Sequence, residues 1–294
     1  MGMNITIITE ALPPSFHWNP AAPVRGTEKF YVETAKALSK KHKVTVTYDG
    51  PVITYGDNLR FVDRNNLPTA SHAILICNRR SRADGLYPIT DRIVEWTNFA
   101  DWTDYGSPVE PLIVISQTAK KLIRNKNRRD IHVIGHGVDK SVYFNANKER
   151  EKTVIYTSSP DRGLNRLIRL WKTHQIQETY GYRLLASAYG NSNVSDKTVA
   201  DALRSASFWV HPGEGIELFC LAAVEAQACG ATPIVVPNGA LSETVMHGYR
   251  FPDQDFDDGL LAVLSGDARM AHVTADHVPD WQSVTDEIER LLVG

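Results

Sequence analysis

Short runs of aliphatic and β-branched residues alternate along the chain with longer stretches whose apolar residues recur at helical spacing. In the first half, this alternation predicts helices at 27–42 and 117–126, and strands at 4–9, 43–48, 73–77, 112–115 and 131–134. Phe30, Ala37 and Leu38 fall on one face of the first helix. The connections are too long for hairpins, so we expect parallel strands with helices over both faces.

The same order restarts after a polar segment at 139–152 that is rich in Lys, Asn and Glu. Beyond it, the pattern predicts strands at 153–157, 182–187, 208–211 and 232–236, and helices at 164–174, 196–205, 219–229 and 283–292. The chain is therefore predicted to be an α/β protein of two doubly wound, Rossmann-like domains. The N-terminal domain is assigned to 1–140, a linker to 141–152 and the C-terminal domain to 153–294, with the final helix a candidate to pack back on the N-terminal domain.

The composition is that of a globular protein with room for two domains: 294 residues, 43% hydrophobic and 22% charged. No apolar run reaches the roughly 18 residues needed to span a bilayer. The first residues lack the cationic segment of a secretory signal, which favours a cytoplasmic location. Cys77, Cys220 and Cys229 have no metal-ligand spacing and are expected to be small core residues.

Charge is distributed unevenly between the two halves. Residues 1–150 contain 21 Lys and Arg against 15 Asp and Glu, whereas residues 151–294 contain 11 against 19. Much of the basic excess lies in clusters at 40–43, 79–82 and 120–129. The clusters are either solvated helix ends and loops, or a surface for an anionic partner such as nucleic acid or a membrane.

The most informative segment follows the strand that ends at His211. A glycine-rich loop leads into a helix whose first N–H groups have no partner within the helix, and such a helix start attracts phosphate. Glu217 lies in the loop, and Glu225 lies two turns into the helix. They are too far apart for a close acid/base pair. They suit the two ends of an elongated ligand, with Glu217 at a sugar and diphosphate and Glu225 at ribose hydroxyls.

This Glu-x7-Glu pattern, followed by Glu-Ala-x-Ala-x-Gly-x-Pro, resembles the retaining GT-B glycosyltransferases that include glycogen synthase-like enzymes and bacterial mannosyltransferases (glycosyltransferases group 1). The resemblance implies two domains facing across a cleft. It also implies a UDP-, GDP- or ADP-linked sugar as co-substrate, and no further cofactor. By the same resemblance, Glu217 contacts the donor sugar, the backbone of Phe219, Cys220 and Leu221 binds sugar and phosphate, and Glu225 binds the ribose.

Two further segments resemble the same family. The turn at 156–164 is similar to the one that carries a basic pair for the donor diphosphate, and here only Arg162 matches, with Ser158 or Ser159 at the other position. Arg162 and Glu217 are therefore the catalytic candidates. Near the N-terminus, Gly26 and Thr27 resemble a glycine-rich turn before the first helix, where Gly26 permits close approach to the donor and Thr27 can cap the helix.

The acceptor side departs from the family pattern. Many relatives carry a His near the reacting sugar, but the comparable stretch at 94–101 has none. Asn98 and Asp101, with Arg79 and Arg80, are the acceptor-side candidates. The Asp-x-Asp sequences at 253–257 resemble the metal site of the other major glycosyltransferase fold, yet an acidic helix start also explains them, so no required metal is predicted.

The resemblance implies a metal-independent hexosyl- or pentosyltransferase that retains the anomeric configuration. The basic N-terminal half favours an anionic acceptor, either a hydroxymethylated DNA base or a lipid or polysaccharide at an anionic membrane. The short chain is typical of a compact viral enzyme. Two alternatives stay open: a GT-B-fold sugar-nucleotide epimerase and an inactive nucleotide-sugar-binding protein. A dinucleotide dehydrogenase is disfavoured because no Gly-x-Gly-x-x-Gly follows the first strand.

Overall fold

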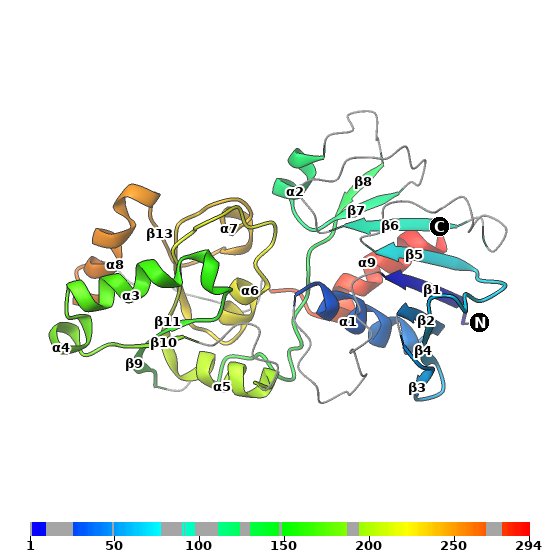
Figure 1. The fold of residues 1–294 in the computed structure, drawn as a ribbon, viewed down its shortest axis with the longest axis horizontal. Coiled ribbons are helices and arrows are strands. Elements are labelled where there is room, and N and C mark those ends of the chain that lie inside the picture. Colours follow the sequence, from blue (N-terminus) through cyan, green and yellow to red (C-terminus); the bar gives the residue numbers. More distant parts are fainter. Residues whose placement is uncertain are drawn as a thin grey trace. The chain divides into compact units, whose positions relative to one another are not determined.

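The computed structural model describes residues 2–9, 26–48, 50–77, 90, 92–97, 111–123, 130–146, 149–186, 194–268 and 278–294. Contacts divide the α/β chain into two compact units (Figure 1): unit 1 is Met1–Gly137 with Trp281–Gly294, and unit 2 is Val138–Asp280. Each unit contains a largely parallel sheet. In the parts of the chain that are described, no helix has the length and apolar character needed to cross a bilayer.

Unit 1 is built on a sheet with the spatial order β3-β4-β2-β1-β5-β6-β7-β8. All pairs are parallel except β3 with β4. The strands are β1 (Asn4–Thr9), β2 (Lys43–Tyr48), β3 (Ile53–Tyr55), β4 (Leu59–Asp63), β5 (Ala73–Cys77), β6 (Ile93–Thr97), β7 (Leu112–Val114) and β8 (Ile131–Val133). The helices are α1 (Thr27–Ser39), α2 (Gln117–Leu122) and α9 (Trp281–Val293).

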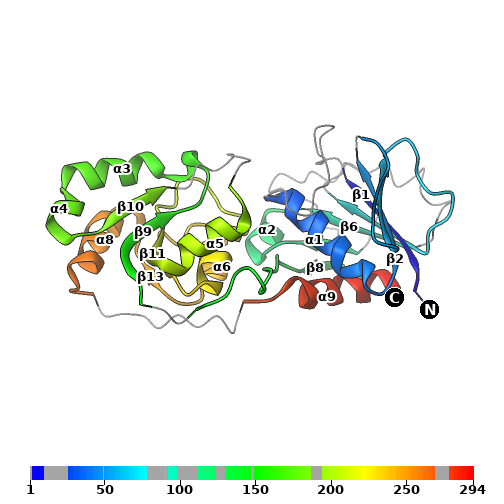
Figure 2. The ribbon, with the colours of Figure 1, turned by 90° about the horizontal axis from the view of Figure 1, so that it is seen from below.

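Helices α1 and α9 lie side by side on the sheet of unit 1 (Figure 2). The face of α1 predicted to be apolar is buried, with Phe30, Ala37 and Leu38 all at most 5% exposed. The last helix, α9, contacts α1, β5 and β6, and buries Ile288 and Leu292. The C-terminal end of the chain therefore completes the core of unit 1.

An aromatic cluster joins the two helices to β6. Phe30 stacks on Trp96 with ring centroids 3.8 Å apart, and His136 meets the edges of Phe30 and Trp281. His136 is buried among these rings, and this burial, together with the nearby Lys29 charge, lowers its pKa to about 3. His136 is therefore an uncharged member of the core at neutral pH.

Part of the basic cluster at 40–43 contacts acidic residues within unit 1. Lys41 Nζ lies 3.0 Å from Asp286 and 2.8 Å from Glu289, and His42 Nε2 lies 3.0 Å from Glu289. Both carboxylates are on α9. Hydrogen bonds from Gln282 and then Lys41 lower the pKa of Asp286, and the hydrogen bond from Lys41 lowers that of Glu289. Lys41 and His42 thus make intramolecular contacts with acidic residues. The cluster at 79–82 lies outside the described residues, as does 124–129 of the third.

Unit 2 is built on a parallel sheet with the spatial order β10-β9-β11-β12-β13. Its strands are β9 (Glu151–Tyr156), β10 (Arg183–Ala186), β11 (Ala206–His211), β12 (Thr232–Val235) and β13 (Tyr249–Arg250). Its helices are α3 (Leu164–Thr173), α4 (Ile176–Tyr180), α5 (Asp196–Ser205), α6 (Leu221–Ala228), α7 (Leu241–Thr244) and α8 (Phe256–Ser265), with single 3₁₀ turns η2 (Pro160–Arg162) and η3 (Asp253–Asp255).

Successive strand residues of unit 2 point to opposite faces of the sheet, and each face has its own core. Val154 and Val210 pack with α3, α4 and α8, whereas Ile155 and Trp209 pack with α5, α6 and α7. Figure 1 shows α3 and α5 on opposite sides of these strands. This two-sided burial explains why β9 and β11 consist of nearly continuous apolar residues.

The segment predicted as a linker at 141–152 is part of unit 2. Tyr143 is 1% exposed and lies in the core against α5 and α6, and Arg204 of α5 donates to the Val142 carbonyl at 2.6 Å. The last two residues of the segment begin β9. The prediction that this segment has little to bury is corrected, because its mostly polar sequence includes one buried aromatic residue, Tyr143.

The His136 environment predicts a pH dependence for unit 1. The unfolded state binds a proton below pH ~6.5, whereas the folded state resists protonation down to about 3, so unfolding becomes easier as pH falls. We expect this group to lower the free energy of unfolding by about 1.4 kcal/mol per pH unit below 6.5. Urea denaturation at pH 7.5 and 5.0 should show a loss of about 2 kcal/mol that is missing from His136→Phe. Equal losses in both proteins would contradict this assignment.

Candidate functional site

The candidate site of unit 2 lies at the carboxyl ends of β9 and β11. These strands are neighbours in the sheet, and the chain leaves β9 toward β10 on one side before returning to β11 on the other. Ligands of doubly wound sheets bind at such a switch in strand order. The loops after the two strands, 157–163 and 212–220, therefore emerge side by side where a ligand is expected.

The loop after β11 is held by the loop after β12. The Asn238 side-chain amide donates to the carbonyls of Gly213 and Gly215 at 3.0 and 2.9 Å. The backbone N–H of Ala240 donates to the Glu217 carbonyl at 2.8 Å. These bonds fix the backbone of the loop on both sides of Ile216, so the position of Glu217 is set by residues more than twenty positions later in the chain.

Arg162 lies against the same loop. Its Nη1 donates to the Ile216 carbonyl at 3.2 Å, and its Nε lies 3.8 Å from Oε1 of Glu217. Gly215 has a φ of +75°, and a Cβ at this position would be 2.8 Å from Arg162 Nη1. A side chain at this position would displace the guanidinium, and the positive φ also favours glycine. The structure brings together Arg162 and Glu217, the two catalytic candidates of the sequence analysis.

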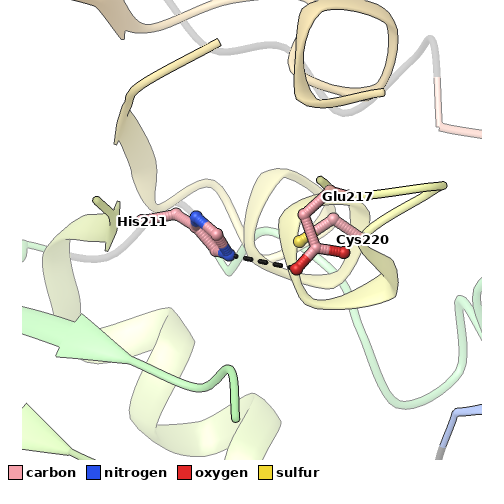
Figure 3. A group of neighbouring side chains, drawn as sticks. All are labelled: His211, Glu217 and Cys220. Carbon is pink, nitrogen blue, oxygen red and sulfur yellow. Dashed lines mark ion pairs between the residues drawn. The ribbon is translucent and has the colours of Figure 1, made fainter. Parts of the chain in front are cut away.

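His211, Glu217 and Cys220 form a compact cluster (Figure 3). Nε2 of His211 lies 3.3 Å from Oε1 of Glu217, and the Cys220 thiol is next to both groups. His211 is fully buried at the end of β11, and its Nδ1 accepts the backbone N–H of Gly213 at 3.1 Å. The Nδ1 lone pair is used by this bond, so the ring carries its proton on Nε2, the atom that faces Glu217.

The spacing of this cluster would suit a metal ion, since its ligand atoms lie within 4.8 Å of one another. Its protonation opposes metal binding, because a metal needs the lone pair of the atom that here carries the proton. Burial also raises the pKa of the Cys220 thiol well above its usual range. The Gly213 hydrogen bond to Nδ1 thus disfavours His211 as a metal ligand.

Phe219, Cys220 and Leu221 form the start of α6. Their side chains pack against the core between α5 and α6. Cys220 is the N-cap residue, in a left-handed conformation with a φ of +64°, and no side chain caps the helix. Non-glycine residues rarely adopt this conformation, which costs about 1–2 kcal/mol. The start of α6 thus presents backbone N–H groups beside Glu217 without a side-chain cap, as an anionic ligand requires.

Glu225 lies on α6 and is 8% exposed. The Tyr143 hydroxyl is hydrogen-bonded to its carboxylate, and burial together with the Glu225 charge raises the pKa of Tyr143. Tyr143 therefore stays protonated throughout the physiological pH range, and its hydroxyl donates a hydrogen bond to the Glu225 carboxylate. The carboxylate of Glu225, the residue predicted to bind ribose, is therefore held in orientation by Tyr143, which lies in the segment predicted as a linker.

The two serines after β9 have different surroundings. Ser158 is buried beside the Cys220 thiol. The Ser159 hydroxyl donates to Asp161, which lowers the pKa of that carboxyl. The Ser159 hydroxyl is thus used in a hydrogen bond within its own turn. Ser158 is adjacent to the cluster of His211, Glu217 and Cys220.

The unit 1 candidates are only partly described. Gly26 has a φ of +59° and is itself the N-cap of α1, which begins at Thr27 without a side-chain cap. Thr27 therefore does not cap the helix, and this prediction is corrected: the helix begins one residue earlier than a Thr27 cap requires. Asn98, Asp101, Arg79 and Arg80 lie outside the described residues.

The Asp-x-Asp sequences have a structural partner. Arg166 of α3 donates to Asp253 and, at 2.7 Å, to Asp257, and its guanidinium lies over the Phe256 ring at 5.0 Å. Asp257 is in the first turn of α8, where a negative charge is favoured. These carboxylates tie α8 to α3.

Three residues that support the site were not predicted from the sequence. His211 was noted only as the end of a strand, Asn238 was given no role, and Tyr143 was placed in a linker. A histidine at the carboxyl end of a strand, directly before a glycine-rich loop, is a usable signal for His211. The roles of Asn238 and Tyr143 depend on contacts between distant segments and have no comparable local pattern.

The support from the β12 loop can be tested at Gly239, whose Cβ would collide with the Glu217 carbonyl oxygen. Gly266, also in unit 2, has a positive φ of +86° but open space around it. Gly266→Ala should lower the free energy of unfolding by about 1–2 kcal/mol through backbone strain alone. Gly239→Ala should cost about 1–3 kcal/mol more because of the collision, as measured by urea denaturation. Equal effects would show that the close approach does not constrain the loop.

Solved structures share this fold along nearly the whole chain. The sucrose-phosphate synthase from Thermosynechococcus elongatus matches with a TM-score of 0.72 and 14% identity over 98% of each chain. HepE from Anabaena, in complex with UDP-glucose, gives 0.66 and 14% over 99% of each chain. WaaG, a glycosyltransferase involved in lipopolysaccharide biosynthesis, gives 0.63 and 13% over 99% of this chain and 100% of its own. No protein-family model and no curated protein sequence matches the chain. The chain has the GT-B fold of glycosyltransferase structures.

Proposed function

We propose that the protein is a retaining glycosyltransferase that moves a sugar from a nucleoside-diphosphate sugar to an acceptor hydroxyl. One observation supports the proposal most directly: Arg162 Nε lies 3.8 Å from Oε1 of Glu217. Both residues lie at the switch in strand order, beside the start of α6. A fixed cation, a carboxylate and a helix start are the groups that recognise a diphosphate joined to a sugar. The likeness to solved glycosyltransferases and to the UDP-glucose complex of HepE supports this choice.

Arg162 and the start of α6 bind the donor diphosphate. Arginine is always charged and can bind two phosphate oxygens at once. Its contact with the Ile216 carbonyl keeps the guanidinium at the loop before the donor arrives. When the bond between sugar and diphosphate breaks, negative charge grows on the phosphate, and groups already in place stabilise that charge without reorganising.

Glu217 and Glu225 bind the two ends of the donor. Glu217 accepts hydrogen bonds from sugar hydroxyls, and Glu225 accepts from the ribose. Tyr143 and the ribose then share the Glu225 carboxylate, which has enough lone pairs for both. The eight-residue spacing places one carboxylate on each side of the helix start that holds the diphosphate.

The transfer needs no strong side-chain base. The acceptor oxygen forms a bond to the anomeric carbon on the face from which the diphosphate leaves, so the configuration is retained. The acceptor proton passes to the departing phosphate oxygen. No step uses a metal, since the diphosphate charge is offset by Arg162 and the helix start.

The acceptor class stays a prediction. An anionic acceptor, such as a hydroxymethylated DNA base or a membrane lipid or polysaccharide, was predicted from the basic first half. Lys41 and His42 already contact α9, so their cluster lends that idea no support. It rests on the basic residues at 79–82 and 124–129. DNA-dependent transfer should weaken steeply with salt if these residues contact phosphates.

The donor site is tested with a panel of UDP-, GDP- and ADP-sugars, by thermal shift and by release of nucleoside diphosphate with and without hydroxymethylated DNA. Arg162→Ala should weaken nucleoside-diphosphate binding about 10- to 100-fold, because it removes charge-assisted hydrogen bonds worth roughly 1.5–3 kcal/mol. Glu225→Ala should abolish the donor-specific shift. Arg169→Ala and Glu178→Ala are matched controls, since both side chains are exposed on α3 and α4.

The outcomes separate the alternatives. Slow release of nucleoside diphosphate from the donor alone is expected for a transferase. An isomerised sugar would identify an epimerase, and tight binding without turnover would identify a nucleotide-sugar-binding protein. If no nucleotide sugar binds the wild type, or if the two control variants lose as much affinity as Arg162→Ala, the proposed donor site is wrong.

A further inference from the structure

The His211 side chain is buried and therefore cannot contact a ligand directly. It lies next to Glu217, the residue assigned to the donor sugar. It is 0% exposed, and Nε2 lies 3.3 Å from Oε1 of Glu217 (Figure 3). We infer that His211 is a positioning residue, which fixes the Glu217 carboxylate for the donor sugar through its Nε2–H. This inference rests on the function proposed above and adds a residue to it.

The direction of the contact follows from the second ring nitrogen. Nδ1 accepts the Gly213 N–H at 3.1 Å, so it cannot carry a proton without placing two donors face to face. The proton is therefore on Nε2, the ring nitrogen 3.3 Å from Oε1 of Glu217, although the N–H and the carboxylate are not aligned as a hydrogen bond in this structure. The strand end and the glycine-rich loop together select this tautomer, because Gly213 is the second residue after His211.

The contact leaves one carboxylate oxygen for the substrate. His211 Nε2 and Arg162 Nε both approach Oε1, at 3.3 and 3.8 Å. Among the described contacts of Glu217, Oε2 is thus the oxygen left to accept from a sugar hydroxyl. A buried N–H without an aligned acceptor costs roughly 1–3 kcal/mol, which favours a shorter approach to Glu217. Contacts of this kind often tighten when substrate is bound.

Two near-isosteric variants separate positioning from support of the loop. Asn places its carbonyl oxygen near the site of Nδ1, so His211→Asn keeps an acceptor for Gly213 and removes the donor to Glu217. Gln places its amide near the site of Nε2, so His211→Gln keeps the donor to Glu217 and removes the acceptor for Gly213. A purely structural role predicts the larger loss for Gln, whereas a positioning role predicts the larger loss for Asn.

We expect His211→Asn to lower kcat for the donor identified by the panel about 10- to 100-fold, by analogy with the loss found when residues that orient metal ligands are removed. His211→Gln should stay within about threefold of the wild type. Binding of UDP, GDP or ADP without sugar should be unchanged in both, since the part of the donor assigned to Glu217 is the sugar and not the diphosphate. In the Glu217→Gln background, His211→Asn should add little, because coupled residues are not additive. A larger loss for Gln, or additive losses, would overturn the inference.

The tautomer can be measured without any substrate. Long-range ¹H–¹⁵N spectra of the full chain at pH 7.5 should show His211 with its proton on Nε2, the resonance being assigned by its loss in His211→Gln. Glu217→Gln should shift that resonance. A proton on Nδ1, or no shift in Glu217→Gln, would overturn the inference even if the protein binds nucleotide sugars. If no nucleotide sugar binds but the spectra are as expected, the proposed function fails and the His211–Glu217 contact stands.

Discussion

The candidate site depends on the direct pairing of β9 with β11. Because the two strands are parallel neighbours, their following loops leave the same edge of the sheet, and Arg162 from one loop reaches the backbone of the other. A strand inserted between them would separate these loops by about 5 Å more. The reversal of strand order at this pair also sends α3 and α5 to opposite faces, so the same arrangement buries the core on both sides and leaves the carboxyl edge open to a ligand.

Most of the fold could be predicted because buried parallel strands are continuous apolar runs bounded by polar residues. β1, β2, β5 and α5 have the predicted bounds. β3 and β4 were missed because one is short and partly exposed, and the other carries Arg60 and Asp63. β6 was missed as a strand because Glu95, a buried carboxylate, interrupts its apolar pattern. Charged residues within short strands conceal them from a periodicity analysis, since tertiary packing outweighs local preference.

Site residues that belong to a short local sequence pattern could be predicted. Those whose role depends on contacts between distant segments could not. Glu217 and Arg162 follow from two short patterns, and the structure places them together. His211 and Asn238 take their roles from a turn and from a neighbouring loop, which no single segment encodes. The cluster at Lys41 and His42 shows the same limit: its basic residues face Glu289, 247 positions after His42. The charge pattern of a sequence cannot distinguish a basic residue exposed to solvent from one that pairs with an acidic residue far along the chain.

The placement of α9 has a consequence for synthesis of the chain. In the sequence, unit 2 is inserted between the two segments of unit 1. The first and last residues of unit 2 lie close together, since the Val138 N–H donates to the Pro279 carbonyl at 3.0 Å. A ribosome-bound chain that has emerged as far as Asp280 contains all of unit 2 but lacks the helix that covers β5 and β6. Until then, Phe30 and His136 have no Trp281 to pack against. Most of unit 1 is thus synthesised first, but unit 1 can finish folding only after unit 2 has been made. During this interval, the nascent chain exposes apolar surface that a chaperone can recognise.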